Sequence, residues 1–294
     1  RYIVNPDLVY ERDEAGRLLD LAPEPAFVPL PPVLMELRET RTIRADVSFQ
    51  IQASFFRSSQ GSVFIPILFD IDAQNLSWSG NYADAKVLGL LEDASGNPLY
   101  RFEEPAALEK GSEGRASFEM PLQLAPGQYT VYLGIEDVAS STVGTKIINI
   151  EVHAFSGQKL ETSSILLFSE GTKTEETLAS PGQAFVIGGY RFTPKHNRVY
   201  ETTDQLAGVF HAYGYALDAG GSANLTAQYI FFRDGEIRGH TPDEPFISIG
   251  QGFAATIFDI PLDRFDPGEY VLKIQVTDHV AGKTIAKDIN FTLK

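Results

Sequence analysis

Short stretches of alternating apolar and polar residues recur along the chain, and one of these patterns occurs twice. The first copy covers residues 118–137 (FEMPLQLAPGQYTVYLGIED) and the second covers residues 258–278 (FDIPLDRFDPGEYVLKIQVTD). Both contain Pro-Leu, then Pro-Gly-x-Tyr, then apolar residues at every second position up to a final Asp. The match extends upstream, because Glu104-Pro105 and Glu244-Pro245 each lie thirteen residues before the first Phe of their copy. We therefore predict two copies of one domain.

The repeated stretch predicts a turn followed by a strand with one buried face. Pro-Gly suits the centre of a type II turn, because proline presets φ and glycine accepts the positive φ that follows. An alternation of period two places the apolar residues on one face of a strand. These residues are Tyr129, Val131, Leu133 and Ile135 in the first copy and Tyr270, Leu272, Ile274 and Val276 in the second. A tyrosine after such a corner fills the core of immunoglobulin-like sandwiches, and its hydroxyl bonds to nearby backbone. We expect both tyrosines to be buried in this way.

The rest of the pattern is also typical of strands and tight turns. Residues 63–71 (VFIPILFDI) form a continuous apolar run, as in a strand covered on both faces, and Pro66 indicates an edge or a bulge within it. Polar loops at 92–98 and at Asp234-Gly235 predict hairpins. Strong amphipathic helix patterns are missing. The prediction is an all-β protein with two tandem immunoglobulin-like β-sandwiches, over residues 46–155 and 156–294.

Residues 1–45 have a different pattern. Leu8-Val9-Tyr10 and Leu18-Leu19 flank a polar turn and predict a short hairpin. Five prolines between residues 23 and 32 then predict an extended, polyproline-like arm. The arm also carries Phe27 and Leu30 and is too apolar for a free linker. We expect it to lie against its own sandwich or against a partner.

Composition excludes several classes of site and partner. The 294 residues include no cysteine, which rules out disulfides, thiolate metal sites and cysteine nucleophiles. The formal net charge of −15 is spread along the chain, and an acidic surface repels phosphate backbones, so nucleic acid is not expected as a partner. No run approaches the roughly 18 apolar residues of a membrane-spanning helix. Because the chain begins at Arg1, we expect a processed or partial product. A sandwich without cysteine fits a bacterial envelope or secreted protein, so we expect it in the periplasm or outside the cell.

Sequence motifs do not support a metal, a cofactor or a catalytic residue. Asp70-x-Asp72 followed by Asn75 resembles the start of a calcium loop, but the required glycine and distal glutamate are absent. Residues 250–255 match G-x-G-x-x-A, but a strand pattern follows them in place of the helix that would bind pyrophosphate. The five histidines lack the paired spacing of a zinc site.

The aromatic residues between positions 185 and 215 exceed what a sandwich core needs. They include Tyr190, Phe192, His196, Tyr200, His211, Tyr213 and Tyr215. If residues 206–217 alternate as a strand, the histidine and the last two tyrosines share a face. Aromatic rings with hydrogen-bonding tips can stack on sugars or bind a protein. The alternative is that these rings line a sandwich edge. With Phe27 and Leu30 of the arm, they are the candidate binding residues.

Three segments carry a resemblance to a known family. They are residues 53–71 (ASFFRSSQGSVFIPILFDI), 89–105 (GLLEDASGNPLYRFEEP) and 160–168 (LETSSILLF). Together they resemble the C-terminal immunoglobulin-like region of large secreted proteins of acidobacterial type, the VWFA-related and GWxTD-containing families. The resemblance covers about residues 46–294 and implies a fold, with no catalytic residues. The chain itself has no Gly-Trp-x-Thr-Asp motif, since its one tryptophan is Trp78.

These patterns indicate a protein without catalytic activity that works by binding. We expect a scaffold or accessory subunit of an envelope or extracellular assembly, with one or more protein partners. The alternative is a carbohydrate-binding or substrate-presenting module of a larger secreted enzyme, whose ligand would be a glycan.

Overall fold

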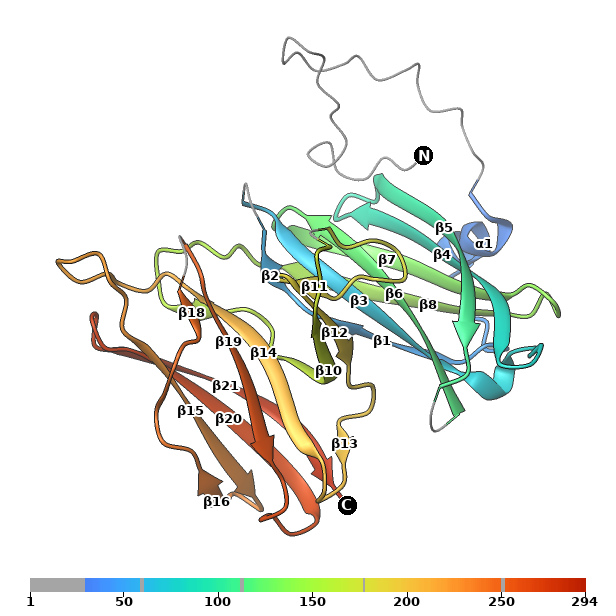
Figure 1. Ribbon diagram of the computed structural model, residues 1–294. Coiled ribbons are helices and arrows are strands. Elements are labelled where there is room, and N and C mark those ends of the chain that lie inside the picture. Colours follow the sequence, from blue (N-terminus) through green and yellow to red (C-terminus); the bar gives the residue numbers. More distant parts are fainter. Residues whose placement is uncertain (1–29, 59–60, 112–113, 177, 250–251) are drawn as a thin grey trace. The chain divides into compact units, whose positions relative to one another are not determined.

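The computed structural model describes residues 30–58, 61–111, 114–176, 178–249 and 252–294 (Figure 1). Strands dominate these ranges, so the all-β fold class is as predicted. The chain divides into two compact units. Of the described residues, unit 1 contains those up to Ala53, Pro66–His153 and Ser180–Ala184, and unit 2 contains Ser54–Ile65, Ala154–Ala179 and Phe185–Lys294.

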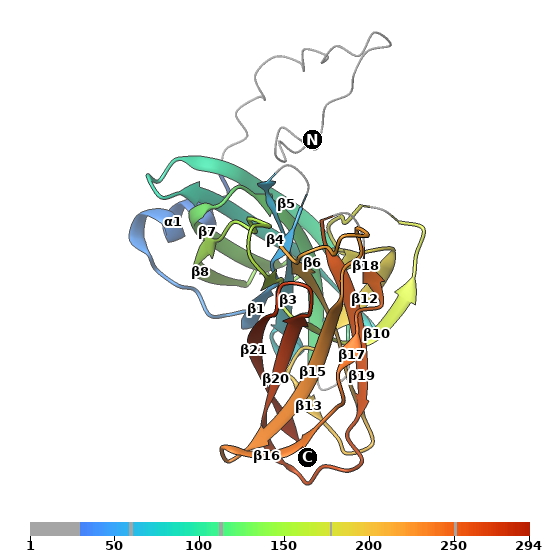
Figure 2. The ribbon, with the colours of Figure 1, turned by 90° about the vertical axis from the view of Figure 1, so that its left-hand side faces the viewer.

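Unit 1 is built from two sheets. In one sheet β1 and β6 both pair with β3, and in the other the strand order is β5-β4-β7-β8. The strands are β1 (Phe49–Ala53), β3 (Val63–Asp72), β4 (Tyr82–Asp93), β5 (Pro98–Glu109), β6 (Arg115–Leu124), β7 (Gly127–Asp137) and β8 (Val143–Val152). A short 3-10 helix, η2 (Ala73–Asn75), follows β3. The helix α1 (Pro32–Thr40) lies against β4 and β7 (Figures 1 and 2).

Unit 2 repeats this plan. One sheet has the order β11-β12-β10-β14-β19-β18, with β9 on β14, and the other has the order β13-β21-β20-β15-β16, with β17 on β15. The strands are β9 (Glu161–Thr162), β10 (Leu166–Lys173), β11 (Val186–Ile187), β12 (Tyr190–Pro194), β13 (Val199–Tyr200), β14 (Gln205–Tyr213), β15 (Leu225–Arg233), β16 (Glu236–His240), β17 (Glu244–Pro245), β18 (Ser248–Ile249), β19 (Ala254–Pro261), β20 (Gly268–Asp278) and β21 (Lys283–Leu293). Rings from both sheets meet in one core, where the Tyr229 and Phe258 centroids lie 4.7 Å apart.

The two copies correspond strand by strand. The order β5-β4-β7-β8 in unit 1 matches β16-β15-β20-β21 in unit 2. The upstream Glu-Pro pair shows that the register matches as well. Pro105 stands opposite Lys86 on β4, and Pro245 stands opposite Thr226 at the corresponding position of β15. The two units therefore share one strand order and one register over these strands.

The hydrogen bonds of both tyrosine corners form as expected, and the expected burial is met by Tyr270 alone. The Tyr129 hydroxyl donates a hydrogen bond to the Ala125 carbonyl oxygen (2.8 Å), and the Tyr270 hydroxyl donates one to the Asp266 carbonyl oxygen (2.7 Å). In both cases the acceptor lies four residues before the tyrosine. The Tyr270 ring is buried, whereas the Tyr129 ring is half-buried. The corner is therefore the same in both units, and its burial is deeper in unit 2.

The aspartate that closes each repeat holds two loops in place. One oxygen of Asp278 accepts the N–H groups of Val280 and Ala281, while the other accepts the N–H of Ala216. Asp137 has the equivalent partners in unit 1: Ala139 and Ser140 in the following turn, and Ser77 in the loop after β3. Both carboxylates are 1% exposed. Each therefore joins the turn after the repeated strand to a loop distant in sequence.

The N-terminal arm differs from its prediction. The hairpin and most of the proline-rich segment, including Phe27, lie outside the described residues. The remainder, expected to be extended, forms α1, because Pro32 stands in the first helical turn, where a missing N–H costs no hydrogen bond. Leu34 and Leu37 are buried against the unit's own sheet.

The two units exchange segments, whereas the predicted domains were continuous stretches. Strand β3 crosses from unit 2 to unit 1 between Ile65 and Pro66. Its first residues pair with β2 (Phe56–Arg57), and residues 67–71 pair with β1. Pro66 falls between the two pairings, where a missing N–H is tolerated. The predicted irregularity at this proline is therefore the point at which the chain changes units.

Candidate functional site

The predicted aromatic residues do not form one surface. Tyr190 and Phe192 lie on β12, where Phe192 is buried, Tyr190 is half-buried and their rings stack at 6.0 Å. Tyr200 lies on β13 and is 2% exposed. His196 is half-buried in the loop between them.

Tyr200 is a core residue with an unusual polar tip. Its ring packs edge-on against Phe291 (5.8 Å), and the Lys195 ammonium lies 4.8 Å from the ring centroid. The hydroxyl is buried and has no hydrogen-bond partner among the described residues. Burial raises the pKa of this phenol well above its usual range, so the ring is neutral at physiological pH.

His211 and Tyr213 belong to an aromatic cluster at the end of β14. The His211 ring stacks on Phe253 (4.9 Å) and meets Phe56 edge-on (5.4 Å), and its Nδ1 lies 3.4 Å from the Tyr213 hydroxyl. The Tyr213 ring packs on Phe155 at 4.9 Å. His211 and Tyr213 are buried, while Phe253 is 38% exposed. Of these rings, Phe253 is therefore the one that a ligand could reach most directly.

Arg57 ties residues 54–65 to this cluster. Its backbone N–H donates to the Tyr213 hydroxyl (3.0 Å), and its guanidinium lies 5.4 Å from the Tyr213 ring centroid. A second link is reciprocal, since Phe55 N–H donates to Ser164 Oγ and Ser164 N–H donates to the Phe55 carbonyl oxygen. A segment that lies between two strands of unit 1 in the sequence thus completes the core of unit 2.

Burial sets the charge state of the cluster. It lowers the pKa of His211 to about 4, because charging the imidazole would place a cation in an apolar site. It raises the pKa of Tyr213 to about 12, since the phenolate is disfavoured in the same way. Both side chains are therefore neutral at pH 7.

The serine beside His211 is not arranged as a nucleophile. Ser163 Oγ accepts the backbone N–H of His211 (2.9 Å) and donates its one proton to the Ser164 carbonyl oxygen (2.7 Å), so that proton is not directed at the imidazole. The nearby Lys287 donates its Nζ to the Ser163 carbonyl oxygen (2.9 Å), and burial lowers its pKa. These polar groups hold strands together and do not form a nucleophile–base pair.

The three residues that resemble the start of a calcium loop, Asp70, Asp72 and Asn75, bond to other groups of the protein. Arg115 Nε binds Asp70 Oδ1 at 2.8 Å, Asp72 caps η2 by accepting the Gln74 N–H, and Asn75 Oδ1 accepts the Ser48 N–H. Within the described ranges, no group of three or more His, Cys, Asp or Glu side chains could hold a metal ion. In the same ranges, no helix is both long and apolar enough to span a membrane.

A second candidate surface lies under α1, on the outer face of the sheet β5-β4-β7-β8. Leu34 and Leu37 pack on Leu88, Leu90 and Tyr132, with Leu30, Val33 and Ile147 at the margin. The contact has a charged border. Arg38 Nε binds Glu92 Oε1 at 2.5 Å, and the Tyr132 hydroxyl donates to Glu92 Oε2 at 3.0 Å. The helix is therefore held by two buried leucines and by an ion pair in which Glu92 is buried and Arg38 is exposed.

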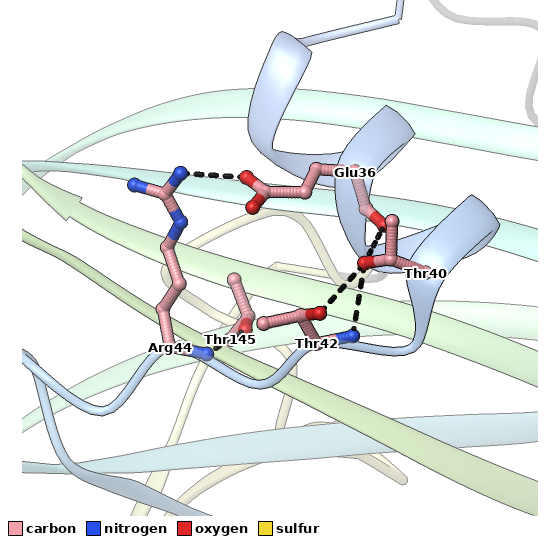
Figure 3. A network of polar contacts seen from close by, with 5 residues as sticks. All are labelled: Glu36, Thr40, Thr42, Arg44 and Thr145. Atoms are coloured by element: carbon pink, nitrogen blue, oxygen red, sulfur yellow. Dashed lines mark hydrogen bonds and ion pairs between the residues drawn. The ribbon is translucent and has the colours of Figure 1, made fainter.

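The chain leaves α1 through a short polar network (Figure 3). Thr40 Oγ1 donates to the Glu36 carbonyl oxygen (2.8 Å), and Arg44 binds the Glu36 carboxylate at 2.6 Å. The Arg44 backbone N–H donates to Thr145 Oγ1 on β8 (2.8 Å). These bonds fix the route from the helix to β1.

The corresponding face of unit 2 is more polar. The registers place Leu88, Leu90, Tyr132 and Gly134 where unit 2 has Gln228, Ile230, Lys273 and Gln275. All four residues of unit 1 are buried and all four of unit 2 are half-buried. Since the two units share one plan, the apolar outer face is a feature added to unit 1.

Sequence reasoning missed the residues that complete both surfaces. Phe56, Arg57 and Phe253 join the aromatic cluster from distant parts of the chain, and no local pattern marks them. Leu88, Leu90 and Tyr132 could have been found, because they place apolar residues on both faces of β4 and β7. Leu30, a predicted arm contact, does lie beside this face.

Comparisons with known proteins do not identify a family. No family model matches the chain, and no curated protein matches it. Among solved structures, trypsin-activated alpha-2-macroglobulin from Escherichia coli aligns with 86% of this chain and 17% of its own, at 9% identity and a TM-score of 0.24. The native conformation of E. coli alpha-2-macroglobulin aligns with 84% of this chain and 14% of its own, at 10% identity and a TM-score of 0.24. This chain thus spans less than a fifth of either protein, and likeness at this level carries no argument about function.

Proposed function

We propose that the protein is a non-catalytic binding scaffold, an accessory subunit of an envelope or extracellular assembly. The observation that supports this is the apolar outer face of unit 1, beneath α1. A β-sandwich needs only one buried face on each sheet, the face toward the core. The equivalent sheet of unit 2 has a more polar outer face, so the apolar outer face of unit 1 exceeds what the fold requires. An extra apolar face that receives an amphipathic helix matches a common mode of protein recognition.

Native purification of the full chain under mild conditions tests this proposal. We expect a protein partner in a fixed molar ratio, seen by light scattering and mass spectrometry of the purified complex. A chain that remains without a partner at its natural concentration, in every fraction, contradicts the scaffold role.

Glycan binding is the second candidate, and one observation favours it. The Phe253 ring is partly exposed and stacks on the His211 imidazole at an interplanar angle of 29°, as in an aromatic platform for a sugar. On a glycan array, Phe253→Ala should remove binding while leaving the fold unchanged. Tyr213 is unsuitable for this test, because it is buried and its replacement would disturb the core.

A further inference from the structure

We propose that the outer face of the sheet β5-β4-β7-β8 is a selective helix-binding site for the pattern Leu-x-x-Leu-Arg, which α1 occupies as a displaceable internal ligand. The inference rests on the proposed binding function and names the class of partner. That partner presents an amphipathic helix with two leucines three residues apart and a basic residue directly after the second.

The apolar half of this recognition comes from Leu34 and Leu37. Both are fully buried, and residues three apart lie on the same side of a helix. Their packing partners come from two adjacent strands, Leu88 and Leu90 from β4 and Tyr132 from β7. The site therefore binds two leucine side chains that are about one helical turn apart.

The charged half comes from Arg38 and Glu92. Glu92 is 4% exposed, and its two oxygens bind Arg38 Nε and the Tyr132 hydroxyl. Arg38 also donates to the Gly96 carbonyl oxygen at 3.3 Å. A buried carboxylate loses much of its stabilisation when its cation is removed. A helix with an acidic residue at this position would therefore be rejected.

The shape of the site depends on Gly134. A Cβ built there would meet Leu34 Cδ2 at 3.6 Å and Leu88 Cβ at 3.4 Å, so a methyl group fits but a longer side chain would occupy the place of Leu34. Unit 2 has Gln275 at the equivalent position. The glycine thus makes room for the helix in unit 1 alone.

Several features make α1 separable from the sandwich. It has nine residues, and an isolated helix of this length is marginal in water, so it depends on docking. Arg41, directly after it, has a left-handed backbone (φ 59°), and the following Thr42 and Ile43 are exposed. Backbone bonds to β8 begin at Arg44 and Ala45. Residues 41–43 are therefore the segment about which α1 can leave while β1 stays paired, once Arg41 moves off the Tyr132 ring (5.1 Å) and the Arg44–Glu36 ion pair opens.

The first test uses the full chain with Leu34→Gln and Leu37→Gln, which uncovers the site. A labelled peptide of residues 30–41 (LPPVLMELRETR) should bind this variant in fluorescence anisotropy, whereas the wild-type chain, whose site is occupied, should not bind it at the same concentrations. The same peptide with Arg38→Glu should bind at least about tenfold more weakly. Equal binding of the two peptides, or equal binding by the two proteins, would overturn the inference.

A second test does not depend on the released variant. In hydrogen exchange of the wild-type chain, α1 amides should exchange faster than those of β4 and β7. Gly134→Gln should accelerate α1 exchange about tenfold or more without changing β7, and the matched control Gln275→Gly should not alter α1. Exchange of α1 together with β7, at one common rate, would show that the helix is not displaceable.

These tests are separate from the test of the scaffold role. If the peptide binds but no native partner exists, the site stands and the scaffold proposal fails. If a native complex forms equally well with Gly134→Gln and with Glu92→Gln, the scaffold stands and this site is not its contact.

Discussion

Asp137 and Asp278 are the clearest single-residue equivalents in the two units. Each is a buried carboxylate that accepts three backbone N–H groups, two from the turn that follows and one from a distant loop. Charge-assisted hydrogen bonds of this kind are stronger than neutral ones. A residue that ends the repeated pattern thus fixes the loop geometry of each sandwich.

Replacing either aspartate with asparagine should destabilise its unit. Asp137→Asn and Asp278→Asn each exchange an acceptor oxygen for a donor amine, so one backbone N–H is left facing a donor. We expect a loss of about 1–3 kcal/mol in the free energy of unfolding, measured by denaturant titration. Asp263→Asn, at an exposed loop position of unit 2, serves as the control. An unchanged midpoint would mean that these loops do not depend on the carboxylates.

The stability that Asp137 contributes depends on pH, and the direction of this dependence follows from its pKa. Burial alone would raise the pKa of Asp137, but the hydrogen bonds from Ser77, Ser140 and Ala139 outweigh it and lower the pKa below its usual value near 3.8. A lowered pKa gives stability that is present above the unfolded-state pKa and lost as the pH falls through the folded-state pKa. The stability difference between wild type and Asp137→Asn should therefore shrink below about pH 4.

The burial of His211 predicts a second effect of pH on stability, at higher pH than that of Asp137. Its pKa is lowered from 6.5 to about 4 by burial, so the unfolded chain binds a proton in this range before the folded chain does. Wild-type stability should then fall as the pH drops from 6.5 to about 4, by on the order of 3 kcal/mol. His211→Gln should flatten this part of the stability curve, as measured by denaturant titration at a series of pH values. A wild-type curve that is level between pH 6.5 and 4 would show that the imidazole is not buried.

At the scale of single elements, the distance to the neighbouring backbone decides whether a glycine can be replaced by a larger residue. A Cβ at Gly144 on β8 would lie 1.7 Å from the Val47 carbonyl oxygen, so a side chain there cannot be accommodated without moving the backbone. Gly134 on the neighbouring strand β7 has no such conflict, since its nearest contact would be 3.4 Å. Two glycines on paired strands therefore have different structural roles.

These two glycines form a matched pair of variants. Gly144→Ala should cost about 1–3 kcal/mol or more, because it forces apart the segment before β1 and strand β8. Gly134→Ala should change stability much less. Thermal unfolding of both variants by circular dichroism measures the difference. Equal melting temperatures would mean that the Val47 contact gives way without cost.

The sequence predicts strands and turns correctly where a short stretch of residues carries the whole pattern. Alternation over four apolar positions identified β7 and β20, and Pro-Gly-x-Tyr identified the corner before each. The sequence does not predict α1, because nine residues with two buried leucines are too few to show a helical period. Pro32 fits both an extended arm and the first turn of a helix, and the prolines before it favour the arm. The burial of Phe192, Tyr200, His211 and Tyr213 could not be predicted, since the elements that cover these rings are distant in sequence.

At the scale of the whole molecule, residues 54–65 are needed by a unit to which they are not adjacent in sequence. They supply Phe56 against His211, the Arg57 N–H to the Tyr213 hydroxyl and the two hydrogen bonds between Phe55 and Ser164. A fragment that begins at Ala154 would lack all of these contacts.

Complementation in trans measures this dependence. A fragment of residues 154–294 should melt at a lower temperature alone than with a saturating peptide of residues 54–65, because a ligand that binds only the folded state stabilises it. A peptide with Phe56→Ala should raise the melting temperature less. If the fragment melts at the same temperature with and without the peptide, these contacts contribute nothing to unit 2.

The exchange of segments also has a consequence for how such a protein can be recombined. The chain passes between the units at residues 53/54, 65/66, 153/154, 179/180 and 184/185. A single genetic crossover near residue 154 would therefore not transfer a complete unit 2. In the hybrid, residues 54–65 would come from one parent and the aromatic cluster that they contact from the other. Ser180–Ala184, which belong to unit 1, would likewise come from a different parent than the rest of that unit. Although the two sandwiches are copies of one plan, a recombination event would have to transfer them together.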